Sequence, residues 1–163
     1  MKKIESRVGY GDVSEGYRIM KEKFVGIRLA EKSKADRLRY MKRLIREIEP
    51  EILVIDGIVD MVENYNDMQE CSRFVDFLMK IRDKYNCTIL YVLHTAKTTG
   101  QSRGHLGTEM DNKSEVVLKT ELVEGELNET KLTTVKNREC KKFDPFNFCQ
   151  VESPFPYINK CKL

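Results

Sequence analysis

The chain of 163 residues lacks several features that would assign it to a class at once. It has no tryptophan, and no apolar run approaches the roughly 20 residues that a membrane helix needs. Its N-terminus returns to charged residues too early for a secretory signal. Its five cysteines are odd in number and include no CxxC pair. They argue against a disulfide framework or a zinc site and predict reduced thiols in a cytoplasmic protein that contacts no membrane.

What the chain does contain fits an ordinary folded protein, because 34% of its residues are charged and 9% are aromatic. The length predicts a single domain (1–163). The net charge is +7 over residues 1–47, −8 over 48–130 and +4 over 131–163. Such basic flanks are compatible with contact to DNA or nucleotide phosphate, and equally with a solvated surface.

Helical and strand patterns alternate along the chain. A helix is predicted from Ser33, with Pro50 as its stop, and a second helix from Asp67 to Asn86. Apolar runs predict buried strands at Ile52–Asp56 and Thr88–Leu93, and weaker strand signals follow at 116–120, 132–136 and 146–151. The fold class is therefore α/β, with a mainly parallel sheet and antiparallel additions at one side.

Asp56 ends the first buried run and is followed by glycine. A continuous apolar run suits a strand buried on both faces of a parallel sheet, and ligands lie beyond the carboxyl ends of such strands. A carboxylate there could hold Mg²⁺ together with nucleotide phosphates. Asp56 could instead cap the next helix.

The second strand leads directly into His94 and Lys97. If the two strands are parallel neighbours, Asp56 and His94 lie side by side at one edge, where an imidazole could sense a phosphate or orient a water. Alternatively, His94 is a histidine with structural partners at a strand end. Residues 98–108 are predicted to form a loop with three glycines and two basic side chains, Arg103 and His105, but without the spacing of a phosphate-binding motif.

Lys136 and Arg138 lie two residues apart near the end of a later strand. In an extended segment they point the same way, and paired cations at a strand tip suit a polyphosphate. The other interpretation is a charged edge strand protected from pairing.

Together these segments resemble the second half of a RecA-like P-loop ATPase, of the branch that contains RepA- and DnaB-type hexameric helicases and plasmid or transposon mobilisation ATPases. The resemblance covers roughly 24–150 and implies a RecA-like three-layer sandwich with its core over 24–150, between a poorly defined N-terminal segment over 1–23 and a tail over 151–163. It implies that Asp56, at the Walker B position, binds Mg²⁺ and that His94 senses the γ-phosphate. It also implies that Lys136 and Arg138 reach a neighbouring subunit's ATP, and that the segment containing Arg103 and His105, with Lys97, contacts DNA.

The chain departs from this family in one large respect, since it contains no GxxxxGK[ST] motif and so lacks the P-loop strand. Glu5 is a candidate for the family's catalytic glutamate. We therefore expect part of an ATPase of replication, unwinding or element transfer that forms a homo-oligomeric ring, with ATP and Mg²⁺ as cofactors of the complete protein. This chain alone is expected neither to bind them tightly nor to hydrolyse ATP.

Two other functions are also compatible with the sequence. One is a non-catalytic RecA-like module that binds nucleic acid or a protein partner. The other is a Mg²⁺-dependent nucleic-acid enzyme, in which Asp56, Asp60 and Glu63 would form a carboxylate cluster; acidic residues at a helix start are the commoner explanation of that spacing.

Overall fold

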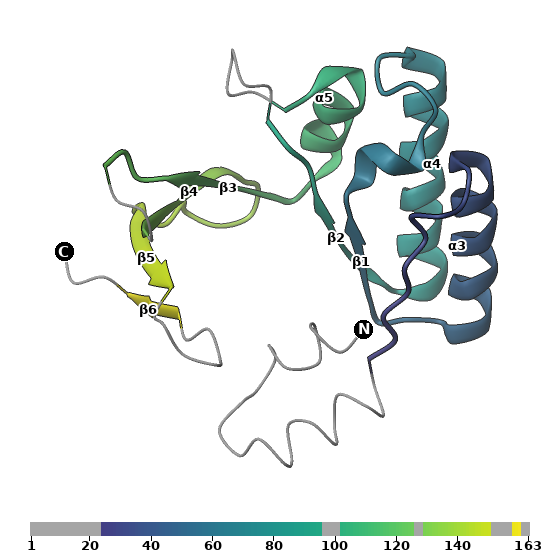
Figure 1. The fold of residues 1–163 in the computed structure, drawn as a ribbon, viewed down its shortest axis with the longest axis horizontal. Helices are drawn as coiled ribbons and strands as arrows, with labels where there is room; N and C mark the ends of the chain where they lie inside the picture. Colours follow the sequence, from purple (N-terminus) through teal and green to yellow (C-terminus); the bar gives the residue numbers. More distant parts are fainter. Residues whose placement is uncertain (1–23, 96–101, 126–128, 151–157, 161–163) are drawn as a thin grey trace. The chain divides into compact units, whose positions relative to one another are not determined.

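The computed structural model describes residues 24–95, 102–125, 129–150 and 158–160 (Figure 1). The chain divides into two compact units, one formed by Arg28–Ser114 and the other by Met1–Ile27 with Glu115–Leu163. Glu5, Lys97 and Val151, to which the sequence assigned a role or a strand position, lie outside the described residues. That the chain forms one domain stays a prediction.

The first unit is an α/β layer built on a parallel strand pair. Its elements follow in the order α3 (Lys34–Ile48), β1 (Ile52–Asp56), the 3-10 turn η1 (Ile58–Met61), α4 (Met68–Tyr85), β2 (Thr88–Val92) and α5 (Gly104–Lys113). Strand β1 pairs in parallel with β2, from Ile52 opposite Thr88 to Asp56 opposite Val92. The predicted parallel pairing is thereby confirmed.

Local capping explains where the two long helices begin. The Ser33 hydroxyl accepts from the Asp36 N–H at 3.2 Å and donates to the Asp36 carboxylate at 2.7 Å. Asp67 caps α4 by accepting from the Glu70 N–H at 2.8 Å. Both helices end at a residue in the left-handed region, Glu49 before Pro50 and Asn86, each with φ of 48°.

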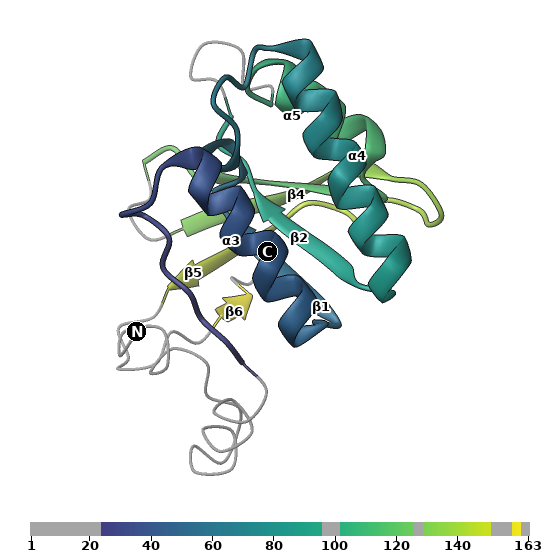
Figure 2. The same ribbon diagram turned by 90° about the vertical axis from the view of Figure 1, so that its right-hand side faces the viewer.

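The core lies on one face of the β1–β2 pair, where α3 and α4 pack side by side (Figure 2). Its buried side chains include Met41 and Ile45 of α3, Ile55 of β1, and Phe74, Val75, Leu78 and Ile81 of α4. On the other face of the sheet four apolar side chains are exposed, namely Ile52 (61%), Val54 (58%), Leu90 (53%) and Val92 (43%). The prediction of strands buried on both faces was wrong for these residues, because an apolar run does not reveal which of its faces is covered.

The second unit holds a four-stranded antiparallel sheet in the order β3-β4-β5-β6. The strands are β3 (Val116–Leu122), β4 (Glu129–Asn137), β5 (Phe146–Gln150) and β6 (Ile158–Lys160). The first three overlap the weak strand signals of the sequence, with β3 and β4 longer than predicted, and β6 was not predicted. The register of β3 against β4 shifts between Val117 and Leu118. The fold thus combines parallel and antiparallel sheets, as expected.

Candidate functional site

The carboxyl edge of the parallel pair gathers the two residues that the sequence singled out first. Asp56 is the last residue of β1 and lies opposite Val92, so His94 follows only two residues beyond that pair. Both Asp56 and His94 are exposed. Because β1 and β2 run in the same direction, their carboxyl ends meet at one edge, which is where α/β sheets bind ligands.

Asp56 is not a helix cap. The N-cap of η1 is Gly57, which makes no side-chain capping bond, and the Asp56–Gly57 peptide bond is cis. The alternating burial along β1 places Asp56 on the same face as the exposed Ile52 and Val54. The carboxylate therefore lies at the rim of the exposed face of the sheet.

The segment after Asp56 is fixed from both sides by helix residues. Glu70 of α4 accepts from the Glu63 N–H at 2.7 Å and from the Asn64 N–H at 2.9 Å. Lys34 of α3 donates to the Glu63 carbonyl oxygen at 3.3 Å. These contacts hold the turn that leads from the Asp56 edge into α4.

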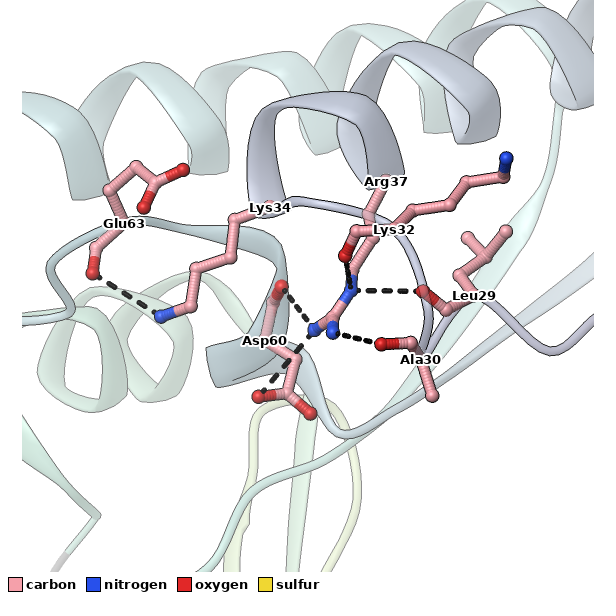
Figure 3. Close-up of polar contacts among 7 residues, drawn as sticks. All are labelled: Leu29, Ala30, Lys32, Lys34, Arg37, Asp60 and Glu63. Carbon is pink, nitrogen blue, oxygen red and sulfur yellow. Dashed lines mark hydrogen bonds and ion pairs between the residues drawn. The ribbon is translucent and has the colours of Figure 1, made fainter.

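Arg37 of α3 makes the densest set of polar contacts in this part of the unit (Figure 3). Its Nε lies 3.0 Å from both the Leu29 and the Lys32 carbonyl oxygens, and its Nη2 lies 2.9 Å from the Ala30 carbonyl oxygen. Its Nη1 donates to the Asp60 carbonyl oxygen at 3.2 Å and lies 3.9 Å from the Asp60 carboxylate. One side chain thus joins the segment before α3 to η1, directly after Asp56.

The segment around Arg103 differs from the predicted loop, because helix α5 begins at Gly104. Gly104 has φ of +69°, and a Cβ there would lie 2.5 Å from Asn66 Oδ1 and 2.6 Å from Tyr65 Cδ2. A Cβ on Gly107 would lie 2.8 Å from the carbonyl carbon of Ser102. These two glycines allow close packing of α5 against the preceding chain, so the glycine content misled the prediction.

Helix α5 is anchored by Leu106, which is fully buried and whose N–H donates to the Tyr65 carbonyl oxygen at 3.0 Å. The Arg103 guanidinium lies over the Tyr65 ring at 5.0 Å from its centroid, a cation–π contact, and it stays exposed. His105, in the first turn of α5, is also exposed. Their predicted contact with nucleic acid stays a prediction.

An isolated antiparallel bridge joins Thr95, which follows β2, to Ser102, which precedes α5. Tyr91 lies near the carboxyl end of β2, and its hydroxyl lies 2.5 Å from Ser114 Oγ, at the C-terminal end of α5. Burial raises the pKa of Tyr91, a nearby Asp111 carboxylate adds to the rise, and the Ser114 hydrogen bond opposes it. Strand β2 is thus fastened to the end of α5.

Lys136 and Arg138 belong to the other unit, so they are described separately from Asp56. Lys136 of β4 lies opposite Val117 of β3 and is half-buried. Arg138 follows the strand, where its N–H donates to the Glu115 carbonyl oxygen at 3.1 Å and its guanidinium lies 3.8 Å from the Glu115 carboxylate. The predicted strand-tip position is confirmed, and the role in nucleotide binding stays a prediction.

The described residues contain no group of three or more His, Cys, Asp or Glu side chains that could hold a metal. In the same part of the chain Asp60 is engaged by Arg37, so the three-carboxylate cluster of the sequence hypothesis is not assembled there. A single exposed carboxylate, Asp56, fits the other mode of Mg²⁺ binding, in which the ion keeps several waters and is shared with phosphates. No described helix has the length and apolar character to cross a bilayer.

The fold is similar to that of known structures, although the sequence has no relative of known function among the curated proteins. No family model and no curated protein matches the sequence. The KaiC-like protein PH0186 from the hyperthermophilic archaeon Pyrococcus horikoshii OT3 matches with a TM-score of 0.57 and 18% identity. The chain shares a RecA-like α/β fold with that protein. The match covers 90% of this chain and 65% of the other, so the chain spans less than two thirds of that structure.

Proposed function

We propose that this chain supplies the Asp56 and His94 part of the nucleotide site in a RecA-like ATPase that acts on DNA, in replication, unwinding or transfer of a mobile element. The observation that carries the proposal is the parallel β1–β2 pair, which brings two exposed polar side chains to one carboxyl edge. The RecA-like fold supports the ATPase-related role, because such sheets bind ligands at that edge.

Each residue then has a stated task. Asp56 would hold Mg²⁺ through the water shell of the ion, and the bound ion would supply charge neutralisation for the nucleotide phosphates. His94 donates a hydrogen bond toward the γ-phosphate or orients the attacking water. Glu70, Arg37 and Lys34 fix the turn after Asp56, so they position the edge without touching the nucleotide.

The first test concerns turnover. The 163 residues contain no GxxxxGK[ST] motif to cradle phosphates, so the chain alone releases no phosphate from ATP above background. Expression together with an in-frame upstream segment that encodes such a motif restores hydrolysis, and Asp56→Asn then abolishes it. Asp76→Asn, an exposed carboxylate of α4, is the matched control and leaves turnover intact. Turnover by the chain alone that disappears in Asp56→Asn would contradict the expectation.

The second test concerns assembly. Lys136 and Arg138 are proposed to serve the nucleotide of a neighbouring subunit in a ring, where a transition-state cation contributes about 10³-fold or more in turnover. Mixing Arg138→Ala subunits with Asp56→Asn subunits, with the upstream segment present, creates some interfaces with an intact site. Activity returns in the mixture if the cations act in trans. No recovery at any ratio, with mixed assembly verified, removes this part of the proposal.

The alternative is a non-catalytic RecA-like module that binds nucleic acid or a protein. One observation favours it, namely the absence of a GxxxxGK[ST] motif from the sequence. The DNA upstream of the Met1 codon separates the two functions. A reading frame that is closed there, or open without such a motif, favours the module.

A further inference from the structure

Helix α3 carries a strong excess of positive charge. Over Lys34–Ile48 it has six basic and two acidic residues, for a net charge of +4. Helix α4, of similar length and packed beside it, has four basic and three acidic residues over Met68–Tyr85, for a net charge of +1. The excess therefore belongs to α3 and is not a general property of the helical layer.

Four of these cations form an outer stripe along α3, made of Arg39, Lys42, Arg43 and Arg46. At 3.6 residues per turn they fall within an arc of about 100° on the helix surface. All four are exposed, with the Arg39 and Arg43 side chains 82% and 67% accessible. The apolar side of the helix, which includes the buried Met41, faces the core and is not available to a lipid surface.

The carboxylates near the stripe do not neutralise it. Asp36 pairs with Arg39, and Glu47 pairs with Arg43 at 2.7 Å. Both are exposed pairs within one helix, and such pairs contribute little and exchange readily with solvent ions. A phosphate, with its fixed charge and bidentate acceptor geometry, competes well for an arginine fork.

The helix is also held rigidly enough to present the stripe. Arg37 ties the segment before α3 to the first turn, and Lys42 lies over the Phe77 ring of α4 at 4.7 Å from its centroid. Lys32 lies over the Tyr40 ring at 4.6 Å and extends the positive surface toward the N-terminal end of the helix.

We propose that the outer stripe of α3 contacts the phosphate backbone of single-stranded DNA. Arg39 and Arg46 lie about 10 Å apart along the helix axis at 1.5 Å per residue, so the stripe is long enough for its four cations to reach successive phosphates of one strand. The four cations line one side of the helix, and such a row of like charges complements the continuous row of phosphates along a strand. The choice of partner rests on the proposed action on DNA, but the stripe shares no residue with the proposed DNA contacts Lys97, Arg103 and His105.

The test uses a fluorescein-labelled single-stranded oligonucleotide and the full chain, titrated between 50 and 200 mM salt. The stripe variant changes Arg39, Lys42, Arg43 and Arg46 to glutamine. The control changes the four exposed cations of α4, Arg73, Lys80, Arg82 and Lys84, to glutamine, with the same loss of charge. The slope of log affinity against log salt is expected to fall by roughly 3 in the stripe variant, because each lost phosphate contact removes about 0.7. Between 50 and 200 mM salt the wild type is therefore expected to lose about 50-fold more affinity than the stripe variant does.

The control variant is expected to lose less than about a third of that slope. An equal loss in both variants would show that net charge alone drives binding, and no loss in the stripe variant would show that the contact lies elsewhere; either overturns the proposal. If poly-glutamate of equal charge density, labelled in the same way, binds the stripe as tightly as DNA does, the nucleic-acid assignment is also overturned.

A second variant guards against misfolding. Lys42→Gln with Arg46→Gln leaves both ion pairs of α3 intact, and the slope is then expected to fall by roughly 1.4, checked on protein with unchanged circular dichroism. Asp56→Asn leaves DNA binding unaltered. Failure of the ATPase proposal and failure of the stripe are therefore seen in different measurements.

Discussion

Replacing Arg37 tests whether one side chain holds the Asp56 edge in place. Its guanidinium donates to the carbonyl oxygens of Leu29, Ala30, Lys32 and Asp60, and only 18% of the side chain is accessible. A hydrogen bond to a charged donor contributes roughly 1.5–3 kcal/mol, but carbonyls near the surface regain water when the donor is removed. We therefore expect Arg37→Ala to cost about 2 kcal/mol, and the melting temperature to fall by about 10 °C.

The measurement is urea unfolding followed by far-UV circular dichroism, with the midpoint expected to fall and the slope to stay unchanged. Arg37→Lys keeps the charge but not the planar fork, so it is expected to recover less than half of the loss. Arg43→Ala, on the exposed side of the same helix, is the matched control and changes the midpoint little. If Arg37→Lys were as stable as the wild type, or Arg37→Ala indistinguishable from the control, the assigned role would be wrong.

Three shorter predictions concern other parts of the molecule. Burial raises the pKa of the Cys71 thiol, so it is expected to react with a thiol reagent at pH 8 far more slowly than the exposed Cys140, and site-resolved mass spectrometry compares the two. Gly104→Ala is expected to cost about 2 kcal/mol or more from positive φ and overlap, whereas Gly125→Ala, at φ +85° with open space, costs about 1 kcal/mol; comparable costs by urea unfolding would contradict the packing argument. Because the pKa of Tyr91 is raised in the folded state, its contribution to the free energy of unfolding is fully present below pH 10 and is lost as pH rises through the folded pKa. Tyr91→Phe is expected to abolish that loss in urea unfolding midpoints measured from pH 8 to 12.

Much of the helical layer was predictable because its signals are local. Ser33 and Asp67 cap the two helices that the apolar spacing predicted, and Asn86 ends the second. The strand at Ile52–Asp56 has the predicted bounds. Once the two strands were taken as parallel neighbours, the meeting of Asp56 and His94 at one edge followed from elementary sheet geometry.

The features that escaped prediction depend on contacts between distant residues. From the sequence, Gly104 indicates a loop. Its role in the start of α5 depends on Tyr65 and Asn66, which lie too close to leave room for a Cβ. The contacts of Arg37 could not be found from spacing, because four of its acceptors are backbone carbonyls that any residue carries. The capping box at Asp67 gave the right helix start, but Glu70 binds the backbone of residues 63 and 64, which no local pattern encodes.

The β1–β2 pair contributes both to the core of the unit, through one face, and to the proposed nucleotide site, through Asp56 at its carboxyl edge. A two-stranded sheet is marginal by itself, and here it is supported through one face, where Ile55 enters the core below Asp56. On the opposite face Val54 and Val92 remain exposed beside the edge. The position of Asp56 therefore depends on the core beneath β1 and on the turn that Glu70 and Arg37 hold. If Asp56 acts as proposed, a displacement of its carboxylate by about 1 Å is enough to lower activity, so loosening these supports is expected to reduce activity before it unfolds the unit.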